Sequence, residues 1–254
     1  MLVERKVGGR TVTFRREPGD APTLVFLHGA SSNYRIHDRL VDALDGWDRI
    51  SLNLPGRAGT EGPPLDGVEP MADFTDEVVR EVVDGRYVFV GYSLGGAIAM
   101  ECALRGDDAL AGLVLLSTGA RLRVNPLAVR MYQAACQTQG ELPAVPAAAF
   151  EDGADRALLE EAAEHRTLTP VETAVMDWRA CDGFDRMDVV DRIDVPTLIL
   201  GGTDDILAPP KFSEFLGSRI AENELHLVPG ARHMMVMERA TEIAPIIASF
   251  LSRL

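Results

Sequence analysis

Short apolar runs alternate along the chain with longer segments of helical pattern. Six runs have the length and composition of buried β-strands: 23–27, 49–53, 87–91, 112–117, 196–202 and 224–230. Between most of them the chain is long enough for one crossover helix, as over Met71–Asp84 and Leu94–Arg105. This alternation predicts an α/β fold in which a mostly parallel sheet carries helices on both faces.

The first seventeen residues follow a different pattern. Leu2–Val7 and Thr11–Arg16 alternate apolar and polar positions on either side of Gly8 and Gly9. Alternation around a glycine pair is typical of a β-hairpin. We therefore expect the sheet to begin with antiparallel strands.

Residues 121–188 interrupt the strand and helix alternation. This segment is rich in Ala, Leu, Glu and Arg, is broken by Pro143, Pro146 and Pro170, and offers no convincing strand. It is too long for a simple connection. We predict a core made of 1–120 and 189–254, with 121–188 inserted as a helical cap over the carboxyl edge of the sheet, where α/β folds place their ligands.

Composition and charge narrow the classes of function. The chain has 254 residues, 46% of them hydrophobic, and its 25 basic and 39 acidic residues give a formal charge of −14. Such a surface repels nucleic acids and anionic membranes, so neither is an expected partner. No apolar run is long enough to span a bilayer.

The cysteines and the N-terminal residues indicate the cellular compartment in which we expect the protein. Cys102, Cys136 and Cys181 form no CxxC pair, and the N-terminus lacks the apolar segment of a signal peptide. We expect reduced thiols in a cytoplasmic protein that holds no metal. The sequence leaves open whether it is a monomer or a homodimer.

The strongest chemical signal is GYSLGG, Gly91 to Gly96, between a predicted strand and a predicted helix. G-x-S-x-G at such a junction is typical of a nucleophile elbow, which exposes the serine hydroxyl at the sheet edge. Gly91 and Gly95 let strand and helix approach closely, and this forces Ser93 into a strained conformation. Ser93 is therefore the candidate nucleophile.

A serine hydroxyl needs a base to remove its proton, and that base is usually histidine. Of the five histidines, only His233 follows Ser93 and lies in a loop beyond a predicted strand, and we assign it as the base. We expect surface or structural roles for His37, His165 and His226.

The carboxylate that orients the base should follow another strand. GGTDDILAPP offers Asp204 and Asp205, which cannot both point into one site. The spacing G-x-x-D-x-x-x-P fits Gly202, Asp205 and Pro209. We choose Asp205 and interpret Asp204 as a solvated turn residue.

Two backbone N–H groups should form the oxyanion hole, and we assign them to Leu94, which follows the nucleophile, and Ala30 in the loop HGASSN. We expect His28 to hold this loop rather than to transfer a proton, and we also include it among the candidate substrate contacts.

Five segments occur in the order seen in the α/β-hydrolase superfamily, which the chain resembles from about Thr23 to its end: HGA, LNLPGRAGTEG, GYSLGG, GGTDDILAP and GARHMMVMER. ACDGFDRMDVVDRIDVPTLILGG is similar to the segment between cap and core in small esterases and enol-lactonase-like members. The resemblance implies an eight-stranded sheet, a helical cap, no cofactor, and a triad of Ser93, Asp205 and His233.

The chain also departs from the family pattern. Many relatives have D-x-P-G-x-G-x-S where this chain has Asn53 to Thr60, and HGA replaces the HGGG of many lipases. The HGA loop weakens the case for long-chain lipids. We expect Arg57 on the surface, with a substrate contact as the alternative.

Apolar cap residues suggest a small, mostly apolar pocket. The candidates are Leu127, Met131, Tyr132, Phe150, Met176, Trp178 and Phe184, of which Met131, Tyr132 and Trp178 are the chosen substrate contacts. The acidic surface offers no evident attraction for anionic substrates.

Together these features predict a serine hydrolase that cleaves a small carboxylic ester or lactone. Hydrolysis of a carbon–carbon bond and perhydrolysis are alternatives with the same triad. A ligand-binding protein without catalytic activity is the alternative from another class.

Overall fold

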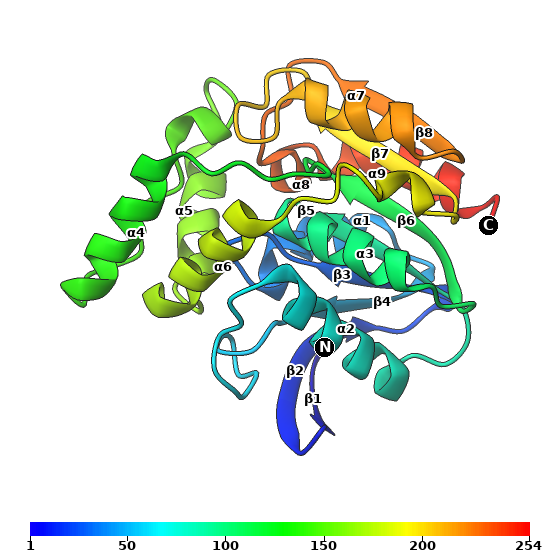
Figure 1. The fold of residues 1–254 in the computed structure, drawn as a ribbon, viewed down its shortest axis with the longest axis horizontal. Helices are drawn as coiled ribbons and strands as arrows, with labels where there is room; N and C mark the ends of the chain where they lie inside the picture. Colours follow the sequence, from blue (N-terminus) through cyan, green and yellow to red (C-terminus); the bar gives the residue numbers. More distant parts are fainter.

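A central sheet of eight strands runs through the molecule, and the computed structural model describes all of residues 1–254 (Figure 1). The spatial order is β1-β2-β4-β3-β5-β6-β7-β8. The strands are β1 (Leu2–Val7), β2 (Arg10–Glu17), β3 (Asp20–Leu27), β4 (Trp47–Leu52), β5 (Tyr87–Tyr92), β6 (Leu110–Leu116), β7 (Thr197–Gly202) and β8 (Asn223–Val228).

The sheet begins antiparallel and continues parallel. β1 and β2 form a hairpin in which Val7 is paired with Arg10, and β2 is antiparallel to β4. Every later pair, from β4 with β3 to β7 with β8, is parallel. The predicted hairpin and the predicted mostly parallel sheet are therefore confirmed.

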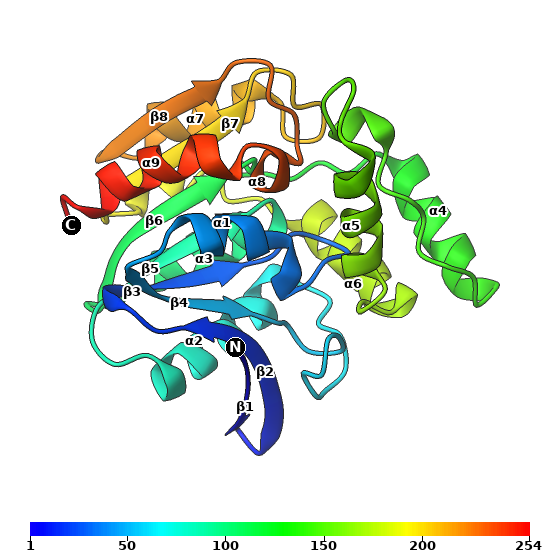
Figure 2. The same cartoon turned by 180° about the vertical axis from the view of Figure 1, so that it is seen from behind.

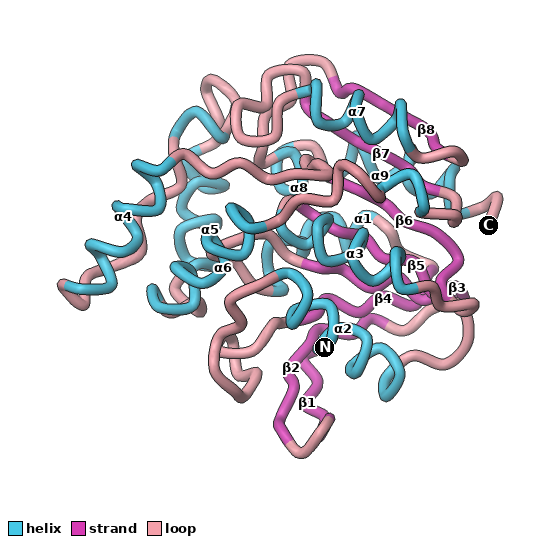
Figure 3. Tube along the Cα trace, viewed as in Figure 1, coloured by secondary structure: helices cyan, strands magenta, loops and turns pink.

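Nine α-helices and three short 3₁₀-helices accompany the sheet (Figures 2 and 3). α2, α3 and α7 cover one face of the sheet, and α1, α8 and α9 cover the other (Figures 1 and 2). The helices are α1 (Asp38–Ala43), α2 (Val68–Val82), α3 (Leu94–Arg105), α4 (Pro126–Gln137), α5 (Arg156–Arg166), α6 (Val171–Gly183), α7 (Pro210–Arg219), α8 (Met235–Glu238), α9 (Ala240–Leu251), η1 (Tyr34–His37), η2 (Ala147–Ala149) and η3 (Val190–Arg192).

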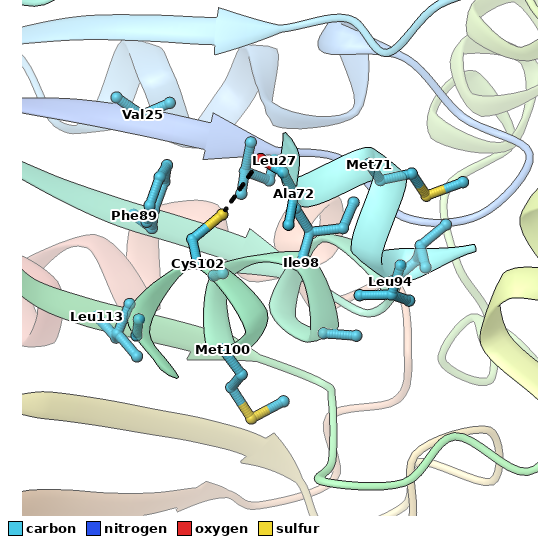
Figure 4. Close-up of a cluster of buried hydrophobic side chains, with 14 of the residues drawn as sticks. Val25, Leu27, Met71, Ala72, Phe89, Leu94, Ile98, Met100, Cys102 and Leu113 are labelled. Atoms are coloured by element: carbon cyan, nitrogen blue, oxygen red, sulfur yellow. Dashed lines mark hydrogen bonds between the residues drawn. The ribbon is translucent and has the colours of Figure 1, made fainter. Parts of the chain in front are cut away.

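The core lies in two layers, one on each face of the sheet. Successive strand residues point to opposite faces, so Val25 and Leu27 of β3 join the layer beneath α2 and α3 while Leu24 and Phe26 join the layer beneath α1 and α9. Figure 4 shows part of the first layer, where Cys102 of α3 lies against Ala72 of α2. Because both faces of the central strands are covered, these strands consist almost entirely of apolar residues.

The segment between β6 and β7 holds three helices that stand apart from the sheet layers. α4, α5 and α6 lie beyond the carboxyl ends of the strands (Figures 1 and 2). The chain leaves the core at Arg121 and returns at Asp185, and these two residues form an isolated β-bridge. We call the part from Arg121 to Asp185 the cap segment.

None of the helices has both the length and the apolar character required to cross a membrane. Cys102 and Cys181 are buried and Cys136 is partly buried, and all three are free thiols.

Two histidines are enclosed in the core beside the sheet. His28 follows β3 and His37 ends η1, and both are almost completely buried. Burial, together with the nearby Arg57 charge, lowers the pKa of His28 well below its ordinary value of 6.5. Burial alone lowers the pKa of His37 to about 3. The folded protein therefore holds both imidazoles neutral.

Acid should destabilise the protein through these two side chains. Below pH 6.5 the unfolded chain binds protons that the folded protein does not, so the free energy of unfolding falls as pH drops from 6.5 towards 3. His37→Leu should reduce the slope of this fall by on the order of 1 kcal/mol per pH unit. Urea unfolding at several pH values measures the slope. His226→Gln, at an exposed position, should keep it, and an unchanged slope in His37→Leu would contradict the prediction.

Candidate active site

Ser93 lies at a tight turn between β5 and α3. Its backbone has φ +53° and ψ −115°, a conformation that L-residues rarely adopt. The turn needs glycine on both sides: a Cβ at Gly91 would lie 2.5 Å from the Gly95 carbonyl oxygen, and a Cβ at Gly95 would lie 1.9 Å from the Leu27 carbonyl oxygen. The strand and helix can thus approach closely enough to present the Ser93 hydroxyl at the edge of the sheet.

Ser93, His233 and Asp205 form a chain of hydrogen bonds. The Ser93 Oγ lies 3.2 Å from His233 Nε2, and His233 Nδ1 lies 2.8 Å from Asp205 Oδ2. An ionised carboxylate can only accept, so Nδ1 donates to Asp205 and Nε2 is left to accept the serine proton. The three residues come from the turn after β5, the loop after β8 and the loop after β7.

The Asp205 carboxylate is held in a fixed orientation. Its Oδ1 accepts the backbone N–H groups of Leu207 and Ala208 at 2.8 and 2.9 Å, and its side chain is completely buried. Asp204 points into solvent and accepts the Thr203 hydroxyl. Of the two carboxylates that the sequence offered, the structure brings Asp205 to His233.

Two backbone N–H groups near Ser93 have no acceptor within the protein. Leu94 is the first residue of α3, where a helix leaves its N–H unpaired. The Ala30 N–H makes no hydrogen bond to the protein, whereas the next N–H, at Ser31, is bound by Asp177 Oδ2 at 2.8 Å. Gly29 lets the loop after β3 approach Ser93 closely, since a Cβ at Gly29 would lie 3.3 Å from the Ser93 Cβ.

A cavity of about 190 Å³ opens at Ser93 and His233, between the strand ends and the cap segment. Its lining is mostly apolar, and more than half of the lining residues belong to the cap segment, in 122–125, α4, the 143–146 loop, α5 and α6. Met131, Tyr132 and Trp178, the candidate substrate contacts, line it, and the ring centroids of Tyr132 and Trp178 lie 5.4 Å apart. Ala30 lines it as well, while the Leu94 side chain packs in the core (Figure 4).

His28 does not line the cavity. Its ring is buried, with Nδ1 2.9 Å from the Gly29 carbonyl oxygen, and Nε2 accepts the Leu54 N–H at 3.4 Å. These contacts join the loop after β3 to the loop after β4, which agrees with the expected role of holding the loop.

The expectation of a surface Arg57 is wrong. The Arg57 guanidinium is completely buried and forms two hydrogen bonds of 2.7 Å with the equally buried Asp177 of α6. Arg57 does not line the cavity either. Its partner lies 120 residues further along the chain, so no local pattern could have predicted this burial.

The sequence interpretation missed several residues of the cavity. Tyr92, Arg123, His165, Arg166 and Met234 line it. Burial raises the pKa of the Tyr92 hydroxyl well above its ordinary value, so the hydroxyl stays protonated and donates to Met234 Sδ at 3.4 Å. Tyr92 directly precedes Ser93 and Met234 directly follows His233. This adjacency is the one feature of the sequence that could have identified them as cavity residues. The three residues of the cap segment belong to no motif.

The side chains show no cluster of three or more His, Cys, Asp or Glu residues arranged to hold a metal ion.

The family follows from a comparison with known proteins. A model of the alpha/beta hydrolase family matches residues 24–246, which is most of the chain. The chain belongs to this family. The expected α/β-hydrolase fold is thereby confirmed, and so is the expectation of a hydrolase.

The proteins that this chain is similar to carry the names of different enzymes. The pimeloyl acyl-carrier protein methyl ester esterase of Neisseria meningitidis is 27% identical over 93% of this chain and 79% of its own length. The 2-succinyl-6-hydroxy-2,4-cyclohexadiene-1-carboxylate synthase of Salmonella agona is 35% identical, but over only 39% of each chain. The enol-lactonase of Burkholderia xenovorans shares the fold, with a TM-score of 0.87 at 21% identity over 98% of this chain and 100% of its own.

Gly95→Ala should disrupt the turn at Ser93. Its methyl group would overlap the Leu27 carbonyl oxygen, and backbone atoms on both sides leave little room to relax. We expect a loss of about 3 kcal/mol in the free energy of unfolding and a large loss of Ser93 reactivity. Gly183→Ala is the control, because a Cβ there meets nothing within 4 Å. Native stability and reactivity in Gly95→Ala would show that the turn is not sterically constrained.

Proposed function

We propose that the protein hydrolyses a small carboxylic ester or lactone through an acyl-enzyme formed on Ser93. The observation that carries this proposal is the hydrogen-bonded chain from Ser93 through His233 to the buried Asp205. Ser93 and His233 line the cavity, and the turn after β5 holds Ser93 in a strained backbone conformation. The esterases and the enol-lactonase among its relatives and structural neighbours support the same reaction class.

The proposed reaction begins when the Ser93 Oγ attacks the substrate carbonyl carbon. His233 Nε2 takes the hydroxyl proton and later passes it to the leaving alkoxide. Asp205 stabilises the imidazolium that forms in between. Water then attacks the acyl-enzyme, with His233 as the base, and releases the acid.

The developing oxyanion needs donors that are already in place. The N–H groups of Ala30 and Leu94 suit this role because neither has an acceptor within the protein and both flank Ser93. The positive end of the α3 dipole adds to their effect. We assign the oxyanion hole to these two groups.

The cavity supports a small acyl group. Its volume of about 190 Å³ is below the roughly 300 to 1,000 Å³ typical of sites for drug-sized ligands. The cap segment supplies most of the walls, and we propose that it acts as a lid that excludes water from the bound substrate.

The charge inside the cavity differs in sign from the charge of the whole protein. Arg123 and Arg166 line the cavity, neither guanidinium is paired with a carboxylate, and no Asp or Glu is part of the lining. Two unpaired cations between apolar walls create a positive local field even in a protein of charge −14. We therefore propose that an acyl group carrying a carboxylate is a better substrate than a neutral one of the same size, in contrast to the expectation from the surface charge alone.

The alternatives remain open to experiment. Carbon–carbon bond hydrolysis and perhydrolysis would use the same three residues. A panel of ester, lactone and diketone substrates, assayed with and without hydrogen peroxide, separates them. A binding protein without catalytic activity would not react at Ser93 with a fluorophosphonate probe, whereas an activated serine would.

Ser93→Ala should abolish turnover of short p-nitrophenyl esters and labelling by the fluorophosphonate, because both require the serine oxygen as nucleophile. The loss of kcat should be on the order of 10⁴-fold or more. Ser117→Ala, which changes a buried serine outside the hydrogen-bonded chain, is the control and should label normally. Labelling that survives in Ser93→Ala would contradict the assignment.

Replacing both cavity arginines should change the choice of substrate. In the double variant Arg123→Gln/Arg166→Gln, the ratio of kcat/KM for a monomethyl dicarboxylate over the neutral methyl ester of equal length should fall about tenfold or more, because a charge-assisted hydrogen bond contributes about 1.5 to 3 kcal/mol. Arg130→Gln, at an exposed residue of α4 outside the cavity lining, is the control. The ratio cancels any general damage to the site, and an unchanged ratio would contradict the role of the arginines.

A further inference from the structure

Ser31 follows the proposed oxyanion donor Ala30 and holds an unfavourable backbone conformation. Its φ is +56°, in the left-handed region that is unfavourable for a residue with a Cβ. Ser31 is almost completely buried. Such a conformation persists only where the surroundings hold it.

Every polar group of Ser31 is bound by the cap segment. Its N–H donates to Asp177 Oδ2 at 2.8 Å, and its Oγ accepts the indole N–H of Trp178 at 2.9 Å. Its carbonyl oxygen accepts from Arg166 Nε at 3.4 Å. Asp177 and Trp178 are neighbours on α6, and Arg166 ends α5.

The next two residues of the loop are held in the same way. The Ser32 carbonyl oxygen accepts the Thr169 hydroxyl at 3.1 Å and Arg57 at 3.0 Å. The Asn33 amide donates to the His165 carbonyl oxygen at 2.7 Å. We call the contacts of Ser31, Ser32 and Asn33 with α5, α6 and the turn between them the clamp.

A buried ion pair fixes the position of the clamp. Asp177 uses Oδ1 for Arg57 and shares Oδ2 between Arg57 and the Ser31 N–H, so one carboxylate binds both the loop after β4 and the loop after β3. Both charged side chains are completely buried. A buried pair of this kind adds little net stability compared with apolar residues of similar size, but it permits few alternative arrangements.

We propose that the cap segment holds the oxyanion hole in its working geometry, with Asp177, Trp178 and Arg57 as positioning residues. The contacts that hold Ser31 at φ +56° also restrain the neighbouring residue Ala30, which lines the cavity together with Ser93 and whose N–H has no acceptor within the protein. If the cap segment moves away, Ser31 loses its three partners and relaxes, and the Ala30 N–H leaves its place. Closure of the cap segment and completion of the oxyanion hole are then one event.

Removal of Asp177 alone would leave Arg57 as an unpaired buried charge and could unfold the protein. The test is therefore the double variant Arg57→Met/Asp177→Leu, which removes both charges and the acceptor of the Ser31 N–H. We expect a folded protein of near-native melting temperature. Its kcat for a short ester should fall about 10²- to 10³-fold, as on loss of an oxyanion donor, with KM changed less than about threefold.

A further readout separates positioning from a merely structural role. A boronic acid that forms a tetrahedral adduct on Ser93 should lose affinity by about the same factor as kcat, because its oxygen occupies the oxyanion hole. A double variant with native kcat and boronate affinity would overturn the proposal.

Glu161→Gln is the matched control. It breaks another ion pair between cap segment and core, that of Glu161 with Arg39, without touching residues 30–33. Its kcat and boronate affinity should stay native, and a loss equal to that of the double variant would show that any loosening of the cap segment has the same effect.

The proposal rests on the proposed function, and hydrogen exchange separates the two. In the native protein the Ser31 N–H should be protected, and in the double variant it should exchange at least about tenfold faster. Native protein that shows this protection but neither labels at Ser93 nor cleaves esters would refute the proposed function and leave the clamp intact. Equal exchange in both proteins would refute the clamp.

Discussion

The close approach of β5, α3 and β3 around Ser93 is the constraint on which the rest of the site depends. It exists because Gly91 and Gly95 lack side chains that would collide with backbone carbonyl oxygens. Because the turn is so tight, α3 begins at Leu94, directly after Ser93. The serine hydroxyl and the first unpaired N–H of the helix therefore lie on adjacent residues. The other strand ends then need only bring His233, Asp205 and Ala30 to this point.

Parallel strands are well suited to that task because their carboxyl ends meet at one edge. β5, β7 and β8 end there, and the segments that follow them carry Ser93, Asp205 and His233. The orientation of Asp205 is fixed by its own loop, through the N–H groups of Leu207 and Ala208. Each group is thus positioned by backbone contacts close to it, so a small number of local motifs describes most of the chemistry.

The cap segment adds what the strand ends do not supply. It provides the walls of the cavity and its unpaired arginines, and it binds the polar groups of Ser31. Charge is distributed unevenly as a result: the molecule is strongly acidic overall, while the cavity lining has arginine but no carboxylate. Net charge therefore says little about the charge that the cavity presents to a ligand.

The sequence by itself determined the order of strands and helices, the initial hairpin and the turn at Ser93, because each depends on residues close together in the chain. Periodicity places strands, glycine permits tight turns, and motif spacing selected Asp205 over Asp204. Only the tertiary structure decided the burial of Arg57, the position of His28 outside the cavity and the clamp on Ser31. The first and the last of these features join residues more than a hundred positions apart, Arg57 with Asp177 and Ser31 with Trp178. A charged side chain looks solvated in sequence, and it is buried only where the fold brings a partner that compensates its desolvation.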